Sequence, residues 1–189
     1  MKNRLSLIFI VLALLISCLI TGCQKSPAPK TQSPAPVPSP STEQENKMET
    51  YSLTLYFSDE QAMFLVPETR IVKASKNADQ IELLELAVME LIAGPEGTNL
   101  SPTFPDETRL LSIDVENGTA VVDFSEELKT KHWGGSAGEV MTLDSLANTL
   151  TEFDGIESVQ ILLEEEPIDS LLGHMDTSKP LIRDESMIK

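Results

Sequence analysis

The chain is poor in cysteine, in aromatic residues and in basic residues. Its 189 residues include two cysteines, one tryptophan and two tyrosines, and 14 Lys plus Arg stand against 30 Asp plus Glu. Both cysteines, Cys18 and Cys23, lie near the N-terminus. Residues 24–189 therefore offer no disulfide, no thiol nucleophile and no cysteine metal site, and they must fold by packing alone.

No hydrophobic run in the chain is long enough to remain as a membrane-spanning helix. The longest run, Leu5 to Ile20, has about 16 residues, whereas a spanning helix needs roughly 20. Lys2 and Arg4 precede this run, and small residues Thr21-Gly22 separate it from Cys23. A positive start, a short apolar core and small residues before a cut site are typical of an export signal.

The segment Leu19-Ile20-Thr21-Gly22-Cys23 resembles the lipobox of bacterial lipoproteins. The resemblance implies that residues 1–22 are removed and that the Cys23 sulfur receives diacylglycerol, whose acyl chains (such as palmitate) hold the protein on the membrane. Two chains hold firmly, because each buried CH₂ contributes about 0.8 kcal/mol and one chain binds only marginally. We expect the protein to lie on the extracytoplasmic face of the cell membrane, in a Gram-positive bacterium. A plain membrane anchor with an incidental cysteine is the alternative.

Residues 23–50 are expected to form a Pro-rich disordered tether. Six of the twelve prolines lie here among Ala, Ser and Thr, so few apolar groups are available to offset the entropy of ordering. As polyproline II the segment would reach about 80 Å. A Pro-rich ligand for an aromatic groove is the alternative interpretation.

Residues 51–189 have the length of one domain, and their charge is strongly negative. They contain 9 Lys plus Arg against 27 Asp plus Glu, a net of −18. Repulsion from phosphates makes nucleic acid and anionic headgroups improbable partners for so acidic a domain.

Hydrophobic periodicity predicts a strand at Tyr51–Phe57. The chain then turns back through Met63–Val66 and Arg70–Lys73 to complete a hairpin, with Pro67 at an edge or bulge. A first helix is predicted from an N-cap at Asn77, with Gln80 completing a capping box, to Gly94. A second helix is predicted from a cap at Ser136 to Gly155, followed by a last strand over residues 157–163.

The dipeptide Asn117-Gly118 predicts a type I′ hairpin, because both positions tolerate positive φ. Folding there pairs three sets of apolar residues on one face: Val115 with Ala120, Ile113 with Val122, and Leu111 with Phe124. The predicted order is strand-strand-helix-strand-strand-helix-strand. We expect an α+β two-layer sandwich, in which two helices pack on one face of a mixed, mostly antiparallel sheet.

Several segments, in this order and spacing, resemble the GerMN domain over about residues 51–184: Leu55-Tyr56-Phe57, Leu65 to Glu68, Ala87 to Gly97, Gly118 to Ser125, Asn148 to Phe153, Val159 to Leu162, Gly173-His174 and Pro180-Leu181. The resemblance implies a lipoprotein linked to sporulation, spore germination or envelope signalling. It also implies a fold similar to ring-building motifs, which self-assemble or scaffold partners. No catalytic residue is assigned to the family. This chain departs from the namesake by its single copy, and Glu164-Glu165-Glu166 replaces a Gly-containing turn.

Gly134 to Gly138 also fits G-x-S-x-G, the nucleophile elbow of α/β-hydrolases, with Asp154 and His174 following in the right order. That elbow needs a strand directly before the serine, but Lys129 to Trp133 is polar and does not alternate. Ser136 as a helix N-cap explains the same residues. We therefore expect no catalytic residues and no enzyme.

No cofactor and no metal site are expected. Two sets of polar residues contain groups that can bind a metal ion: His174 with Asp176, and Asp114, Asp123 and Glu126. A hydrogen bond in the C-terminal tail is the expected role of the first set, and a solvated acidic face is that of the second. His132 lies too far from His174 in sequence to form a ligand pair. Trp133, in a Gly-flanked loop, either contacts a partner or covers a sheet edge.

The sequence favours a lipid-anchored, extracytoplasmic binding or scaffold module of the cell envelope, linked to sporulation or spore germination. Its expected partners are the membrane through Cys23, and envelope proteins or a second copy of the chain. A cell-envelope enzyme or a small-ligand binder acting at the cell wall is the alternative.

Overall fold

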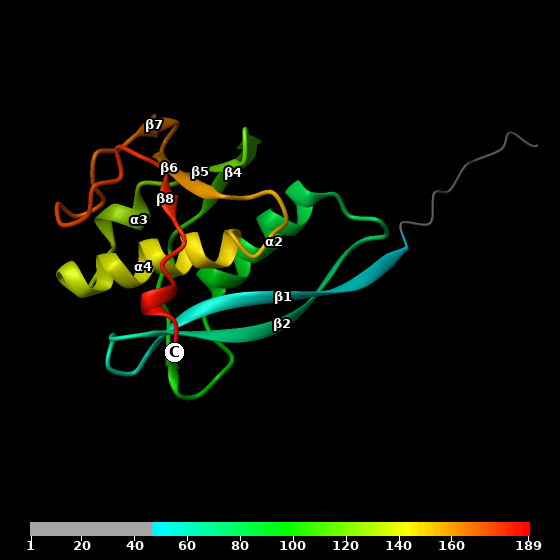
Figure 1. Ribbon diagram of the computed structural model, residues 1–189, viewed down its shortest axis with the longest axis horizontal. Coiled ribbons are helices and arrows are strands. Elements are labelled where there is room, and N and C mark those ends of the chain that lie inside the picture. Colours follow the sequence, from blue (N-terminus) through cyan, green and yellow to red (C-terminus); the bar gives the residue numbers. More distant parts are fainter. Residues whose placement is uncertain (1–46) are drawn as a thin grey trace, which may run out of the picture. The chain divides into compact units, whose positions relative to one another are not determined.

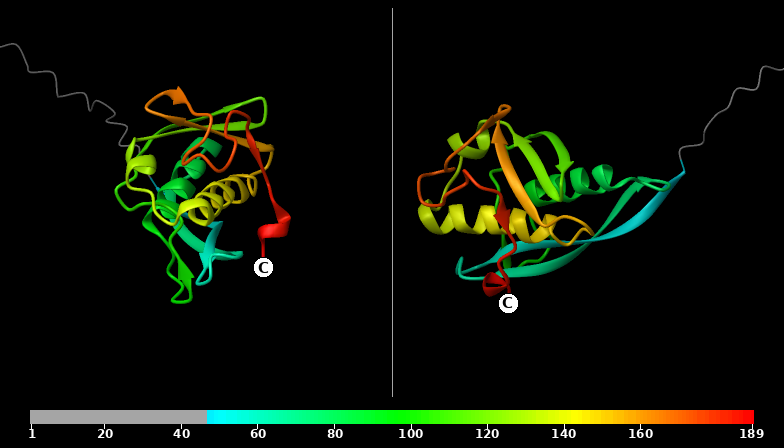
Figure 2. Two further views of the ribbon diagram at one scale, coloured as in Figure 1. Left: turned by 90° about the vertical axis from the view of Figure 1, so that its left-hand side faces the viewer. Right: turned by 45° about the horizontal axis from the view of Figure 1, so that its top comes forward.

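Two β-sheets enclose a layer of helices in the computed structural model, which describes residues 47–189 (Figure 1). One sheet contains β1 (Met48–Asp59) and β2 (Leu65–Ser75), and the other contains β4 (Leu110–Glu116), β5 (Thr119–Phe124) and β6 (Ser158–Leu163). The helices α2 (Gln80–Ala93) and α4 (Gly135–Leu150) lie between the sheets (Figures 1 and 2). The predicted export signal, the lipidation of Cys23 and most of the predicted tether lie outside the described residues.

The first sheet has the strand order β2-β1-β3. Its strands are β1 (Met48–Asp59), β2 (Leu65–Ser75) and β3 (Leu100–Ser101). β1 and β2 form the predicted antiparallel hairpin, and Pro67 pairs with Tyr56 on the edge strand without a break in register. Because β1 begins at Met48, the folded domain starts three residues before the expected boundary at residue 51.

The second sheet contains the predicted Asn117-Gly118 hairpin. Both residues have positive φ, 50° and 82°, and they join β4 (Leu110–Glu116) to β5 (Thr119–Phe124). The pairs Val115–Ala120 and Ile113–Val122 are confirmed. The predicted pair Leu111–Phe124 is wrong. A register shift follows Leu110, so Leu110 pairs with Phe124 and Leu111 is exposed.

A parallel strand and two short antiparallel ones complete this sheet. The parallel strand β6 (Ser158–Leu163) lies beside β5, and β7 (Glu166–Pro167) and β8 (Leu181–Ile182) pair with β6. Glu164 and Glu165 form the turn into β7, and both have positive φ. Glutamates thus occupy a left-handed turn in which glycine is the less strained residue.

The helices are α2 (Gln80–Ala93), the single-turn α3 (Glu127–Thr130) and α4 (Gly135–Leu150). The N-cap of α2 is Asp79, whose carboxylate accepts a 2.9 Å hydrogen bond from the Glu82 N–H. The predicted cap at Asn77 is wrong, since Asn77 occupies a left-handed turn with φ 59° before the helix. The predicted end of α2 at Gly94 is confirmed.

The α+β class is confirmed, but the expected single sheet with helices on one face is wrong. The prediction failed because α4 is buried on two faces: every residue from Met141 to Leu150 is buried. Its apolar face joins the main core. On its other face the Ser145 hydroxyl donates to the Tyr56 carbonyl at 2.6 Å, and the Thr149 hydroxyl accepts from the Tyr56 N–H at 3.1 Å. Small hydroxyls thus satisfy the backbone groups of Tyr56 that the pairing of β1 with β2 leaves free.

The C-terminal segment connects the two sheets. β8 belongs to the second sheet, a short 3₁₀ helix, η1 (Glu185–Met187), follows, and Ile188 then forms a bridge with Leu65 at the edge of the first. The Lys189 N–H donates to the Leu65 carbonyl at 2.9 Å. Within residues 47–189, no helix combines the length and the apolar character needed to cross a bilayer.

A candidate binding cleft at the start of α4

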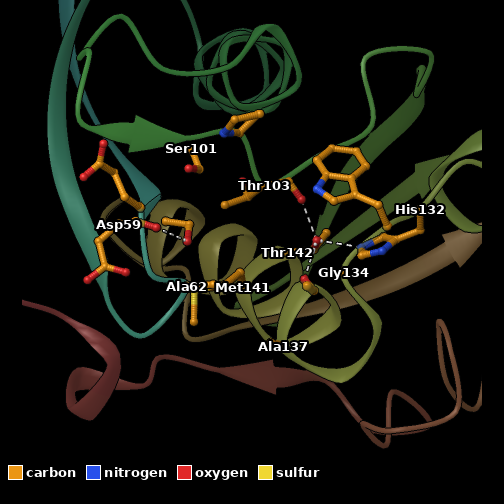
Figure 3. Close-up of a pocket in the computed structure, with 14 residues that line it drawn as sticks. Asp59, Ala62, Ser101, Thr103, His132, Gly134, Ala137, Met141 and Thr142 are labelled. Carbon is orange, nitrogen blue, oxygen red and sulfur yellow. Dashed lines mark hydrogen bonds between the residues drawn. The ribbon is translucent and has the colours of Figure 1, made fainter.

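A cleft of about 220 Å³ lies where three segments of the chain meet: the β1–β2 turn, the residues after β3, and the start of α4. Asp59 lies at one end of it and His132 at the other, with Thr103 and Thr142 between them (Figure 3). Trp133 and Met141 contribute apolar lining. Residues from three distant parts of the sequence therefore share one concave surface.

The glycine-rich entry to α4 has a backbone explanation. Gly134 is the N-cap residue and adopts φ 85°, and no side chain caps the helix. The prediction that Ser136 caps α4 is therefore wrong: Ser136 lies inside the first turn and is exposed. Gly138 is required because a Cβ there would lie 2.2 Å from the Trp133 carbonyl oxygen.

The nucleophile-elbow interpretation also fails on geometry. The element before Ser136 is the helix α3 and not a strand, so the serine does not stand on a strand-to-helix turn. Asp154 follows the opposite end of α4, roughly 20 Å along the helix axis from Ser136 at 1.5 Å per residue. These three residues, Ser136, Asp154 and His174, therefore form no triad.

His132 fixes the loop that leads into α4. Its Nε2 lies 2.8 Å from the Thr142 hydroxyl, which is also within hydrogen-bond distance of the Thr103 and Gly138 carbonyl oxygens. Since the hydroxyl donates to a carbonyl, the histidine Nε2 carries the proton. Burial lowers the pKa of His132, so the ring is neutral at physiological pH. His132 is thus a structural anchor.

Trp133 is held at the rim of the cleft by its neighbours. The adjacent His132 is anchored to Thr142, and the Trp133 carbonyl lies against Gly138. The indole itself remains 46% exposed, with its ring centre 5.8 Å from that of His132. An exposed aromatic on a well-anchored loop is an arrangement typical of partner-contact residues. The assignment of Trp133 as a partner contact stays a prediction.

Asp59 places a negative charge at the other end. Its Oδ1 accepts hydrogen bonds from the N–H groups of Met63 at 2.9 Å and Phe64 at 3.3 Å. The Met63 hydrogen bond is the main cause that holds the pKa of Asp59 below its usual value, and Lys189 adds a favourable charge. Asp59 is the last residue of β1, and it was not among the site residues predicted from the sequence.

The remaining candidate residues serve the fold. The His174 N–H donates to Glu139, a buried residue of α4 that also accepts from Leu172 and Ser170, and Asp176 accepts from Ser178. Sequence reasoning missed this role of Glu139. In the described part of the chain, no group of three or more His, Cys, Asp or Glu side chains could hold a metal ion. Asp114, Asp123 and Glu126 therefore form no calcium site.

Comparison with known proteins gives a family match. The family model described as "Germane: Sporulation and spore germination" matches residues 54–169. No curated protein matches the chain significantly. Among solved structures, a Clostridium perfringens protein described as a "Putative Lipoprotein" is 27% identical, with a TM-score of 0.50, over 71% of this chain and 87% of that one.

Two further structures come from the sporulation protein GerM of Bacillus subtilis. Its tandem GerMN domains are 24% identical with a TM-score of 0.58, over 74% of this chain and 46% of that chain. Its first GerMN domain alone is 21% identical with a TM-score of 0.53, over 70% and 98% of the two chains. The present chain thus spans about half of the tandem structure, and the likeness to GerM concerns the fold.

Proposed function

The chain belongs to the Germane family of sporulation and spore germination proteins, and from that membership we propose that it is a lipid-anchored, non-enzymatic binding module of the cell envelope. Cys23 would attach the protein to the outer face of the cell membrane. The domain formed by residues 47–189 would then bind an envelope protein, or a second copy of itself, during sporulation or germination.

Two observations support the proposed location. The first 23 residues combine a basic start, a short apolar run and a lipobox-like end. The Clostridium perfringens protein, whose description names it a lipoprotein, covers most of the same domain at 27% identity.

The binding role is carried by one observation, the exposed indole of Trp133 on a loop anchored through His132 and Gly138. Tryptophan is among the residue types most enriched in binding hot spots. Because the loop is held in place, binding would lose little conformational entropy.

The anchor is tested by Cys23→Ala in the full chain. We expect the protein to leave the membrane fraction and to lose incorporation of a clickable palmitate analogue. Cys18→Ala, inside the predicted signal, is the matched control and retains both. A Cys23→Ala protein that still incorporates the analogue would contradict the lipid anchor.

The binding role is tested by photo-crosslinking in sporulating cells of the source bacterium. A photoreactive amino acid is placed at Trp133 or at Ile71, an exposed apolar residue on the edge strand β2. We expect a specific protein adduct, identified by mass spectrometry. Finding no protein adduct at any exposed site, together with a stoichiometric small ligand in native mass spectrometry, would favour the small-ligand alternative.

A further inference from the structure

We propose that the cleft between Asp59 and Trp133 receives a single basic side chain, lysine or arginine, from a partner protein. The proposal rests on the proposed binding function and adds to it the chemistry of the partner and the place where it binds. Three properties of the cleft carry it: its size, its charge and its aromatic rim.

The size of the cleft suits one side chain. Its volume of about 220 Å³ lies below the roughly 300 to 1,000 Å³ of pockets that enclose a drug-sized molecule. Its lining combines the apolar side chains of Trp133 and Met141 with the carboxylate of Asp59. A lysine or arginine matches such a mixed lining, because it has an apolar stem and a charged end.

The charge of the cleft selects against anions. None of its lining residues is Lys or Arg, and His132 contributes no positive charge because its ring is neutral. Asp59 is 93% buried, and its Oδ1 is already bonded to two backbone N–H groups. The exposed Glu60 lies beside it in the lining. Two carboxylates and no lining cation make the cleft a cation-selective surface.

Lys189 bears on this charge balance. It lies over the Phe64 ring, 5.9 Å from its centre, and its charge reaches Asp59. Lys189 does not line this cleft, but it shares a second, neighbouring hollow with Asp59 and Glu60. The net charge of −18 over residues 51–189 also favours the approach of a basic partner.

The aromatic rim supplies the second contact. Trp133 is the one tryptophan of the chain, and tryptophan is the side chain that attracts a cation most strongly through its ring face. Because its carbonyl lies against Gly138, the backbone that carries the indole is held in place before the partner arrives. A basic side chain that enters the cleft thus meets the ring and the carboxylate together.

The test is NMR titration of the unit Gln44–Lys189, which is compact and contains the whole core. The probes are four small compounds: Ac-Ala-Arg-Ala-NH₂, Ac-Ala-Lys-Ala-NH₂, the charge-inverted Ac-Ala-Glu-Ala-NH₂ and the neutral sugar N-acetylglucosamine. The indole N–H of Trp133 gives an unambiguous signal. We expect saturable shifts with the two basic peptides, with a Kd on the order of 1 mM, and none with the other two probes.

Matched variants identify the groups involved. Asp59→Asn keeps the Oδ1 acceptor for the turn and removes the charge, so we expect the fold to survive and the affinity to fall about threefold. Asp106→Asn removes the same charge from an exposed site outside the cleft and leaves the affinity unchanged. Trp133→Ala, followed through the Thr103 and Gly138 amides, weakens binding by about threefold or more.

Three results would overturn the proposal: equal or tighter binding of the glutamate peptide or the sugar, an Asp106→Asn effect as large as that of Asp59→Asn, or no saturable shift with either basic peptide. If an envelope protein is still captured by crosslinking in that case, the binding function stands and only the assignment of the cleft fails.

Discussion

The carbonyl oxygen of Trp133 lies directly over the backbone of Gly138, at a place where any side chain would collide with it. A Cβ at Gly138 would be 2.2 Å from this oxygen and 3.4 Å from Cε1 of His132. Because Gly138 has no side chain, the loop can close on α4, and the exposed indole of Trp133 lies at the rim of the cleft.

Gly138→Ala should destabilise the domain and displace the loop. The inserted Cβ meets backbone that cannot move without disturbing the His132–Thr142 contact, so we expect the free energy of unfolding to fall by about 1 to 3 kcal/mol. Urea denaturation followed by the fluorescence of Trp133 measures it. Gly135→Ala is the control: its Cβ meets nothing within 4 Å, and its φ of 57° accounts for a loss of about 1 kcal/mol. Equal losses in the two variants would contradict the steric explanation.

Ser136→Ala should leave stability nearly unchanged. Ser136 is exposed and makes no capping hydrogen bond, so we expect a change of less than about 0.5 kcal/mol. Asp79→Ala is the contrasting variant, because it removes the cap that accepts from Glu82, and we expect it to lower the free energy of unfolding by about 1 kcal/mol. Thermal unfolding of the two variants compares their losses in the free energy of unfolding. A larger loss in Ser136→Ala would restore the capping interpretation.

The stability of the domain should depend on the protonation of Asp144. Burial, with the nearby charge of Asp184 adding to it, raises the pKa of Asp144 from 3.8 to about 6. The folded state therefore holds this proton more tightly than the unfolded chain does. The resulting contribution is fully present below pH 3.8 and is lost as the pH rises through about 6.

Asp144→Asn removes this pH dependence. Relative to the unmodified protein, we expect the variant to gain about 2 to 3 kcal/mol between about pH 4 and pH 7.5. Urea denaturation at both values measures the difference between the two proteins, in which the titration of all other groups cancels. A difference that does not change with pH would contradict the raised pKa.

Arg70 should be among the least replaceable charged residues. Its side chain is 8% exposed and donates to Glu68 at 2.5 Å, to Glu90, and to the Gly94 carbonyl at 3.0 Å. Arg70→Met removes the cation from two carboxylates and the donor from the Gly94 carbonyl, and Glu68 keeps only backbone N–H donors, so we expect a loss of about 3 to 5 kcal/mol.

Arg109→Met is the matched control for that variant. Arg109 is 64% exposed and pairs with Glu127 at 3.4 Å, so its removal should change the free energy of unfolding by less than about 1 kcal/mol. Chemical denaturation of the two variants under the same buffer conditions compares them directly. Similar losses would show that the burial of Arg70 has no energetic weight.

Local patterns predicted the elements of this fold better than their boundaries. Asn117-Gly118 located a hairpin, because few dipeptides tolerate two positive φ angles, and alternation on both sides then set most of the register. The register shift after Leu110 left no mark in the apolar pattern, so Leu111 was assigned to the wrong face. The predictions of the helix caps failed for a similar reason. Asn77, Asp79 and Ser136 are all good capping residue types, and only the path of the backbone decides which of them caps a helix.

The sequence by itself determined the order of the seven longest elements, the α+β class and the acidic, cysteine-free character of the domain, because these follow from composition and from periodicities of two to four residues. The short elements β3, α3, β7 and β8 were not predicted. The tertiary structure decided that the strands divide into two sheets, that α4 is buried on both faces, and that Asp59 and Trp133 line one cleft. These are relations between residues far apart in the sequence, as in the hydrogen bond from Tyr56 to Thr149, 93 positions away. Such contacts depend on how whole elements pack, and no local pattern encodes them.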